Sequence, residues 1–129
     1  MNAVHALIID DNIRNIHVLA NLLADENITC THITNPKQLD SVMQTSDEIN
    51  VIFLDLEMPG LDGYEVHKIL RSNSRFNGVP IVACTVHISE IHTASQVGFD
   101  SFLGKPLNAD NFPQQIARIL HGEGVWVTS

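Results

Sequence analysis

A short buried strand that ends in a carboxylate and a glycine-containing loop most constrains what this chain can fold into. Residues 50–63 read Asn-Val-Ile-Phe-Leu-Asp-Leu-Glu-Met-Pro-Gly-Leu-Asp-Gly. The apolar run before Asp55 is typical of a central parallel strand that is buried on both faces. Asp55 must lie where that strand leaves the sheet, because burying a carboxylate in mid-strand without a partner would cost several kcal/mol. Pro59 and Gly63 then predict a loop.

Strand-like and helix-like segments alternate five times along the 129 residues. Apolar runs predict strands at residues 4–9, 27–33, 50–54, 80–84 and 101–104. Apolar residues spaced three and four apart predict a helix after each strand, and Asn111 is favoured over Asn108 as the last cap because Pro113 would disturb a longer helix. This order predicts one α/β domain with a parallel sheet and helices on both faces. We place the domain at residues 1–122 and a short C-terminal tail at 123–129.

The composition narrows the functional classes. A formal net charge of −8 and a pI near 5.1 argue against a nucleic-acid binder, which would show a basic face. The longest apolar stretches are far too short to cross a bilayer and the first residues lack a signal-peptide pattern, so we expect a cytoplasmic protein with no membrane partner. Cys30 and Cys84 lie in strand-like runs without further ligands at metal-binding spacing, which predicts buried, reduced thiols.

Chemically active side chains follow four of the five predicted strands. They are Asp10 and Asp11 after the first strand, Asp55 after the third, Thr85 after the fourth and Lys105 after the fifth. In an open parallel sheet, these strand ends border the ligand crevice. Three crowded carboxylates repel one another unless a hard divalent cation neutralises them, and Mg²⁺ is the natural candidate. Lys105 and Thr85 suit a phosphoryl oxygen, and Asp55 is then the nucleophile that forms an acyl phosphate.

These separated motifs together resemble the receiver domain of two-component response regulators over essentially the whole chain. The resemblance rests on the acidic pair Asp10-Asp11, on Asp55 followed by Met58-Pro59 and Gly63, on Thr85, and on Lys105-Pro106. The chain is most similar in kind to stand-alone, chemotaxis-regulator-like receivers. The resemblance implies a doubly wound (βα)5 flavodoxin-like three-layer sandwich with a five-stranded parallel sheet of order 2-1-3-4-5.

The resemblance also implies what happens at Asp55. Mg²⁺, with Mn²⁺ as a substitute, is held by Asp10 or Asp11, by Asp55 and by the backbone carbonyl of Glu57. Asp55 takes a phosphoryl group from a histidine kinase or a histidine phosphotransfer protein. The chain is therefore not expected to be an enzyme beyond catalysing its own phosphorylation and dephosphorylation.

The same resemblance implies that residues at the fourth and fifth strands transmit the signal. Thr85 and Lys105 read the phosphoryl group, and the movement of Thr85 toward it makes room for the switch aromatic Phe102 to leave the surface. The signal then leaves through the fourth helix, the fifth strand and the fifth helix. The Lys105–Pro106 bond is commonly cis in the family, as Pro106 permits. The alternative for Phe102 is a permanent place in the core.

Three positions that vary in the family border the phosphoryl group and are expected to tune its lifetime. They are Glu57, Val86 and His87. A branched Val86 should narrow the approach of water and slow self-dephosphorylation, while Glu57 and His87 position or exclude water. The alternative is that Val86 simply packs on its loop.

Three other classes of protein share part of this pattern. A haloacid-dehalogenase-like phosphatase also uses a strand-end aspartate, but its second aspartate is replaced here by Glu57. A flavodoxin-like or nucleotide-binding module needs a phosphate loop after the first strand, where this chain has Asp10-Asp11-Asn12. A degenerate receiver that binds partners without phosphorylation stays open as an alternative.

The chain ends soon after the predicted fifth helix, so we expect its output to be a protein contact. We expect a monomer or a weak phosphorylation-dependent dimer. The protein could act as a diffusible regulator, as an intermediate in a phosphorelay or as a phosphate sink. The tail carries Val125-Trp126-Val127, and packing on its own domain is favoured over extending the sheet of a partner.

Overall fold

The computed structural model describes residues 3–45 and 48–128. The strands are β1 (His5–Ile9), β2 (Thr29–Ile33), β3 (Val51–Leu54), β4 (Glu57–Met58), β5 (Leu61–Asp62), β6 (Ile81–Thr85), β7 (Ser101–Gly104) and β8 (Trp126–Val127). The α-helices are α1 (Ile13–Ala24), α2 (Leu39–Met43), α3 (Gly63–Arg71), α4 (Ile91–Val97) and α5 (Phe112–Leu120). Short 3₁₀ turns lie at Pro36–Gln38, Ser74–Phe76 and Ile88–Glu90. None of the helices in the described ranges is long and apolar enough to cross a membrane.

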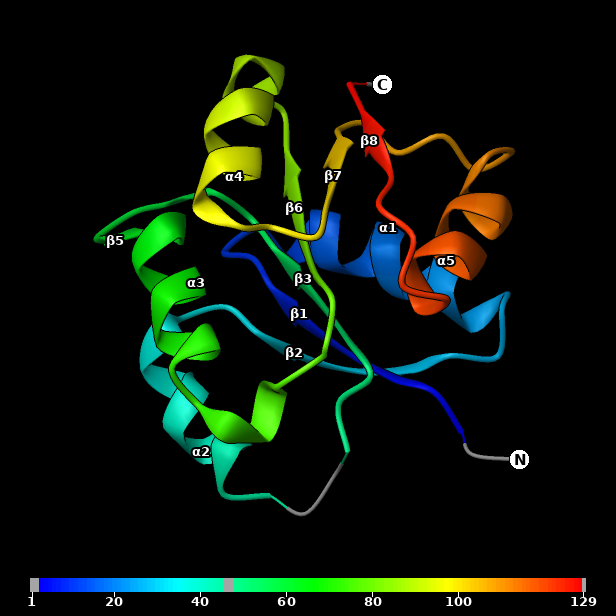
Figure 1. The fold of residues 1–129 in the computed structure, drawn as a ribbon. Coiled ribbons are helices and arrows are strands. Elements are labelled where there is room, and N and C mark those ends of the chain that lie inside the picture. Colours follow the sequence, from blue (N-terminus) through cyan, green and yellow to red (C-terminus); the bar gives the residue numbers. More distant parts are fainter. Residues whose placement is uncertain (1–2, 46–47, 129) are drawn as a thin grey trace.

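Six strands form one parallel sheet in the order β2-β1-β3-β6-β7-β8, and β4 and β5 form a separate antiparallel hairpin. α1 and α5 cover one face of the sheet, and α2, α3 and α4 cover the other (Figure 1). The expected flavodoxin-like three-layer sandwich is therefore confirmed. The predicted strand order 2-1-3-4-5 corresponds to β2, β1, β3, β6 and β7.

The expectation of only five strands in the sheet is wrong, because part of the C-terminal tail joins it. β8 lies parallel to β7, with Trp126 opposite Phe102. Val125, just before β8, is buried and packs in the cluster beneath α1 and α5. The tail thus packs on its own domain, as favoured from the sequence. The added strand has a physical reason, since it pairs with the backbone N–H and C=O groups at the edge of β7 and covers apolar surface there.

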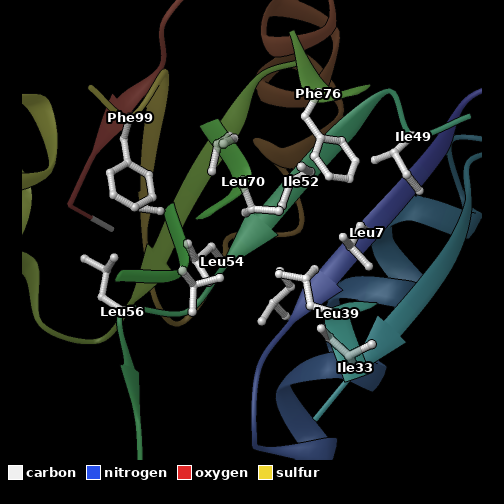
Figure 2. Packing of buried hydrophobic residues seen from close by; sticks show 14 of the residues in the cluster. Leu7, Ile33, Leu39, Ile49, Ile52, Leu54, Leu56, Leu70, Phe76 and Phe99 are labelled. Carbon is white, nitrogen blue, oxygen red and sulfur yellow. The ribbon is translucent and has the colours of Figure 1, made fainter. Parts of the chain in front are cut away.

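Two apolar clusters fill the spaces between the three layers. Figure 2 shows the cluster between the sheet and α2, α3 and α4, where Leu7 and Leu54 from the sheet face Leu70 and Phe99. The alternate residues of β1 and β3 enter the other cluster, beneath α1 and α5. The central strands are therefore buried on both faces, as their unbroken apolar runs predict.

The spacing of apolar residues predicts that Ile13 of α1, Ile69 of α3 and Val97 of α4 face the core. The structure leaves these side chains 46%, 47% and 43% exposed. His67 instead takes an inner position of α3, and its ring packs on Phe99 with centroids 4.3 Å apart. Helices of seven to nine residues carry too few turns for sequence spacing alone to define the buried face.

Buried His67 makes a pH-dependent contribution to stability. Its Nε2 has no hydrogen-bond partner among the described residues. Burial lowers the pKa of His67, and Arg71 lowers it further, while Gly98 and Asp100 oppose the change. Because the unfolded chain takes up the proton at a higher pH than the folded chain, this contribution is present above the ordinary histidine pKa and is lost as the pH falls.

We expect His67→Phe, which keeps a ring against Phe99, to reduce the loss of stability on acidification from pH 7 to pH 5. Urea unfolding of wild type and His67→Phe across this range gives the free energy of unfolding of each protein as a function of pH. The difference between the two curves cancels the contributions of other titrating groups. An exposed histidine, His92, provides the control as His92→Phe. Parallel profiles for wild type and His67→Phe would contradict the assignment.

Both cysteines are free thiols, as predicted, but only Cys84 is buried, because Cys30 lies in the strand β2 at the edge of the sheet and stays partly exposed. Burial raises the pKa of Cys84 in β6 to about 12. Burial also raises the pKa of the half-buried Cys30 thiol in β2. Because the thiolate is the reactive form, both side chains act as packing residues.

Candidate phosphorylation site

Parallel pairing brings four strand ends to one edge of the sheet. β1 and β3 are neighbours in register, so Asp10 and Asp55 emerge side by side. β6 and β7 are neighbours as well, and the Lys105 amide donates to the Thr85 carbonyl oxygen at 2.8 Å. Because β3 also pairs with β6, all four side chains belong to the same carboxyl edge. The sequence prediction of a site at this edge is consistent with the geometry.

Three carboxylates lie close enough to share one cation. Oxygen atoms of Asp10, Asp11 and Asp55 all lie within 4.8 Å of one another. Asp10 and Asp55 are buried, and Asp11 is exposed at the mouth of the site. Carboxylate oxygens at this separation form a donor set for a hard divalent cation, because their mutual repulsion is relieved when it binds.

Lys105 supplies positive charge to the two buried carboxylates. Its Nζ lies 2.7 Å from Asp10 Oδ2 and 3.9 Å from Asp55 Oδ2. Burial alone would lower the pKa of Lys105, but its hydrogen bond to Asp10 and the surrounding negative charges leave that pKa raised. Lys105 therefore stays an ammonium, and its closest carboxylate partner is Asp10 rather than the proposed phosphoacceptor.

The Asp55 carboxyl group is less acidic than an ordinary aspartate. Burial raises the pKa of Asp55 to about 6, which Lys105 partly offsets and Asp10 reinforces. The Glu57 amide donates to Asp55 Oδ1 at 3.2 Å and favours the carboxylate. At neutral pH, Asp55 is thus mostly ionised, as a nucleophile must be, yet it is more basic than an exposed aspartate.

The loop after Asp55 is shaped by the β4–β5 hairpin and by Gly63. Asp62 caps α3 by accepting a hydrogen bond from the Tyr64 amide at 2.9 Å. A Cβ built on Gly63 would lie 2.6 Å from Leu56 Cα and 2.9 Å from the Asp55 carbonyl oxygen. Glycine is required here by the close approach of the backbone that carries the phosphoacceptor. Pro59 lies between the two strands of the hairpin, as the predicted loop requires.

A contact between two side chains crosses the rim of the site. His87 Nε2 lies 2.8 Å from Glu57 Oε2, which joins the loop after β6 to β4. Thr85 is fully buried, and its Oγ1 accepts a hydrogen bond from the His87 amide at 3.1 Å. Val86 is 61% exposed, so it projects from this rim. Sequence reasoning selected these positions but had no signal for their pairing.

Two further predicted residues lie on the β7 side of the site. The Phe102 ring is fully buried in the cluster beneath α2, α3 and α4. The Lys105–Pro106 peptide bond is cis. The structure therefore places the Phe102 ring in the core, which agrees both with the inward state of a switch and with a permanent place in the core.

An apolar cleft of about 130 Å³ opens beside the carboxylates, between α1 and the loop after β7. Asp10, Asp55 and Lys105 line it at one end. Val18 and Leu107 are among its apolar lining residues. These apolar residues carry no signal for the site in the sequence, because only the fold brings α1 against the loop that follows Lys105.

Comparisons with known proteins identify the family. The model of the response regulator receiver domain matches residues 6–117. Stress response regulator protein 1 is 31% identical over 106 residues in Candida tropicalis and 34% over 110 residues in Debaryomyces hansenii. Hybrid signal transduction histidine kinase A of Dictyostelium discoideum is 31% identical over 118 residues. The chain belongs to the response regulator receiver family, and it is a receiver domain of two-component signalling.

The alignments cover most of this chain but only part of each relative. They span 79%, 83% and 88% of the chain in the order given above. They span 40%, 46% and 6% of the relatives themselves. The chain thus corresponds to less than half the length of these proteins.

Solved structures share the fold. The chemotaxis response regulator CheY4 of Vibrio cholerae has a TM-score of 0.80 at 22% identity, over 92% of this chain and 99% of that one. The receiver domain of a Pseudomonas aeruginosa sensor histidine kinase has a TM-score of 0.80 at 23% identity, over 93% and 99% of the two chains. That receiver holds a magnesium ion in its active site cleft.

Proposed function

We propose that this receiver domain takes a phosphoryl group onto Asp55, with Mg²⁺, from a histidine kinase or a histidine phosphotransfer protein. The observation that best supports this proposal is the arrangement of charged side chains around Asp55. Its buried carboxylate has an ammonium 3.9 Å away and two further carboxylates within 4.8 Å. The similarity to a hybrid histidine kinase supports a histidine-based donor. Output by protein contact remains part of this proposal.

The donor set fits Mg²⁺, which prefers oxygen ligands. Asp10, Asp11, Asp55 and the backbone carbonyl of Glu57 would hold the ion, and Mn²⁺ would take the same ligands. When bound, the ion supplies positive charge that neutralises the carboxylates and the incoming phosphoryl oxygens. The magnesium ion in the Pseudomonas receiver supports this assignment.

The reaction exchanges one bond to phosphorus for another. An Asp55 carboxylate oxygen attacks the phosphorus atom, and the bond from phosphorus to the histidine nitrogen breaks, with the electron pair going to the imidazole. The product is an acyl phosphate on Asp55. Lys105 stays charged and lies close enough to pair with the new oxygens, and the buried Thr85 hydroxyl provides a donor on the other side. The chain performs this step only on itself, so it is not an enzyme acting on other substrates.

Intact-mass spectrometry of the full chain tests the proposal. With acetyl phosphate and Mg²⁺, we expect one phosphoryl group per chain, and EDTA should prevent the addition. Asp55→Asn should abolish it, because an amide lacks the nucleophilic oxygen anion. Asp62→Asn, at an exposed helix cap nearby, is the matched control and should keep the adduct. An undiminished adduct in Asp55→Asn would contradict the assignment, whereas no adduct in wild type would favour the degenerate receiver.

The lifetime of the acyl phosphate is expected to depend on Val86. Its side chain projects from the rim, so truncation opens the approach of water without removing a core contact. We expect Val86→Ala to lose its phosphoryl group a few-fold faster than wild type, measured after removal of the donor. Ile88→Ala, which shortens another exposed side chain of the same loop, is the control. Equal decay of wild type and Val86→Ala would show that Val86 does not restrict water.

A further inference from the structure

β8 forms the outer edge of the sheet against the strand that leads into the site. The Phe102 amide donates to the Val125 carbonyl oxygen at 2.8 Å. The Val125 amide donates to Ser101 Oγ at 3.0 Å in a buried hydrogen bond. Every residue of β7 is buried, although β7 would be the edge strand without β8. Residues 124–128 therefore shield the edge of β7 (Figure 1).

Gly104 leaves no clearance between β7 and this shielding segment. A Cβ on Gly104 would overlap the Thr128 carbonyl oxygen. Gly104 is not among the glycines with positive φ, so the close approach is what requires glycine. Gly104 directly precedes Lys105 in the chain. A displacement of the Lys105 backbone would therefore also move Gly104, which lies against Thr128 at the end of residues 124–128.

A phosphoryl group on Asp55 provides a force on Lys105. In the present state, Lys105 Nζ lies closer to Asp10 than to Asp55, at 2.7 Å against 3.9 Å. Phosphorylation would replace the single negative charge of the Asp55 carboxylate by up to about two negative charges on the phosphoryl group. β8 is the strand to yield first, because it pairs with β7 through two residues whereas β1 and β2 pair through five.

We propose that residues 124–128 are a displaceable edge segment that phosphorylation of Asp55 releases, and that the exposed edge of β7 then binds an extended apolar strand of a partner protein. The proposal rests on the proposed function at Asp55. The residues of the partner strand can be inferred from Val125 and Trp126, which lie along the edge of β7 in this structure. Val125 is buried and Trp126 is 38% exposed, so a replacement strand needs a β-branched residue facing inward and tolerates a large aromatic residue outward.

Amide exchange of the full chain by NMR tests the release. The chain is compared in Mg²⁺ alone and in Mg²⁺ with beryllofluoride, with ¹⁹F spectra reporting occupancy of the site. We expect exchange of the Phe102 and Val125 amides to become at least about tenfold faster with beryllofluoride. Asp55→Asn should show no change. If beryllofluoride occupies the site but both rates stay constant, the release is wrong while the proposed function stands; if it does not bind, the proposed function fails.

Gly104→Ala tests the mechanical contact without any phosphoryl mimic. The added methyl group should displace Thr128 and speed exchange of the Phe102 amide. Trp126 is the only tryptophan of the chain, so its fluorescence reports the same opening. Ile69→Ala, on the exposed face of α3, is the control. Wild-type exchange and fluorescence in Gly104→Ala would overturn the coupling.

Docking at the exposed edge is tested with a labelled peptide that has the sequence of residues 122–128. Fluorescence anisotropy should show binding to the wild-type chain with Mg²⁺ and beryllofluoride. Binding should be absent with Mg²⁺ alone and in Asp55→Asn. If exchange shows release but the peptide does not bind, the edge of β7 is not a docking surface for an extended apolar strand.

Discussion

Replacing Lys105 by alanine is expected to cost about 3 kcal/mol of unfolding free energy at pH 8 without divalent cations. The change leaves Asp10 and Asp55 buried beside each other without the ammonium that now lies 2.7 Å and 3.9 Å from them. The loss should shrink toward pH 5, because Asp55, with its pKa raised to about 6, then takes up a proton. Added Mg²⁺ should also recover stability, since the ion replaces the missing positive charge.

Urea unfolding at pH 8 and pH 5, with and without Mg²⁺, measures these effects. Lys37→Ala removes an exposed lysine and should change little under any of the four conditions. A Lys105→Ala protein as stable as wild type at pH 8 in EDTA would show that the buried carboxylates do not depend on this ammonium.

Gly63→Ala is expected to destabilise the chain by about 3 kcal/mol and to reduce phosphorylation of Asp55. The new methyl group would lie 2.6 Å from Leu56 Cα and 2.9 Å from the Asp55 carbonyl oxygen. These are backbone atoms, so no side-chain rotation relieves the overlap. The loop that presents the nucleophile must move instead, which misplaces Asp55 relative to Lys105.

Gly78→Asn is the matched control for Gly63→Ala. Gly78 has a φ of 77° and open space around a built Cβ, and asparagine tolerates this backbone region. Thermal unfolding and the acetyl phosphate reaction should therefore stay close to wild type in Gly78→Asn. Normal stability and normal adduct formation in Gly63→Ala would refute the requirement for glycine beside Asp55.

The layered fold was predictable because its signals are local. Unbroken apolar runs, bounded by turn-forming residues such as glycine and proline, predict the five strands at residues 4–9, 27–33, 50–54, 80–84 and 101–104 without information on which strands pair. β8 escaped prediction as part of the sheet because Trp126 and Val127 of the tail become a strand only when β7 offers an edge. The inward place of His67 was missed for a related reason, since contact with Phe99 decides it.

The convergence of the strand-end residues was predictable from the sequence, but the pairing of their side chains was not. Asp10, Asp55 and Lys105 each follow a strand, Thr85 is the last residue of β6, and parallel strands end at one edge. That Lys105 contacts Asp10 more closely than Asp55 depends on side-chain conformation. Because of this pairing, removing Asp10 would free Lys105 as well as relieve repulsion between carboxylates. Relief of repulsion is therefore expected more clearly from changes at the exposed Asp11.

Residue-level localisation of the phosphoryl group tests the central claim about Asp55 most directly. The full chain is treated with acetyl phosphate and Mg²⁺ and then with borohydride, which reduces an aspartyl phosphate to homoserine. Peptide sequencing by mass spectrometry then reads each aspartate position. We expect homoserine at position 55 only, and none after treatment in EDTA. Homoserine at position 10, 11 or 62, with position 55 unchanged in a phosphorylated chain, would contradict the account.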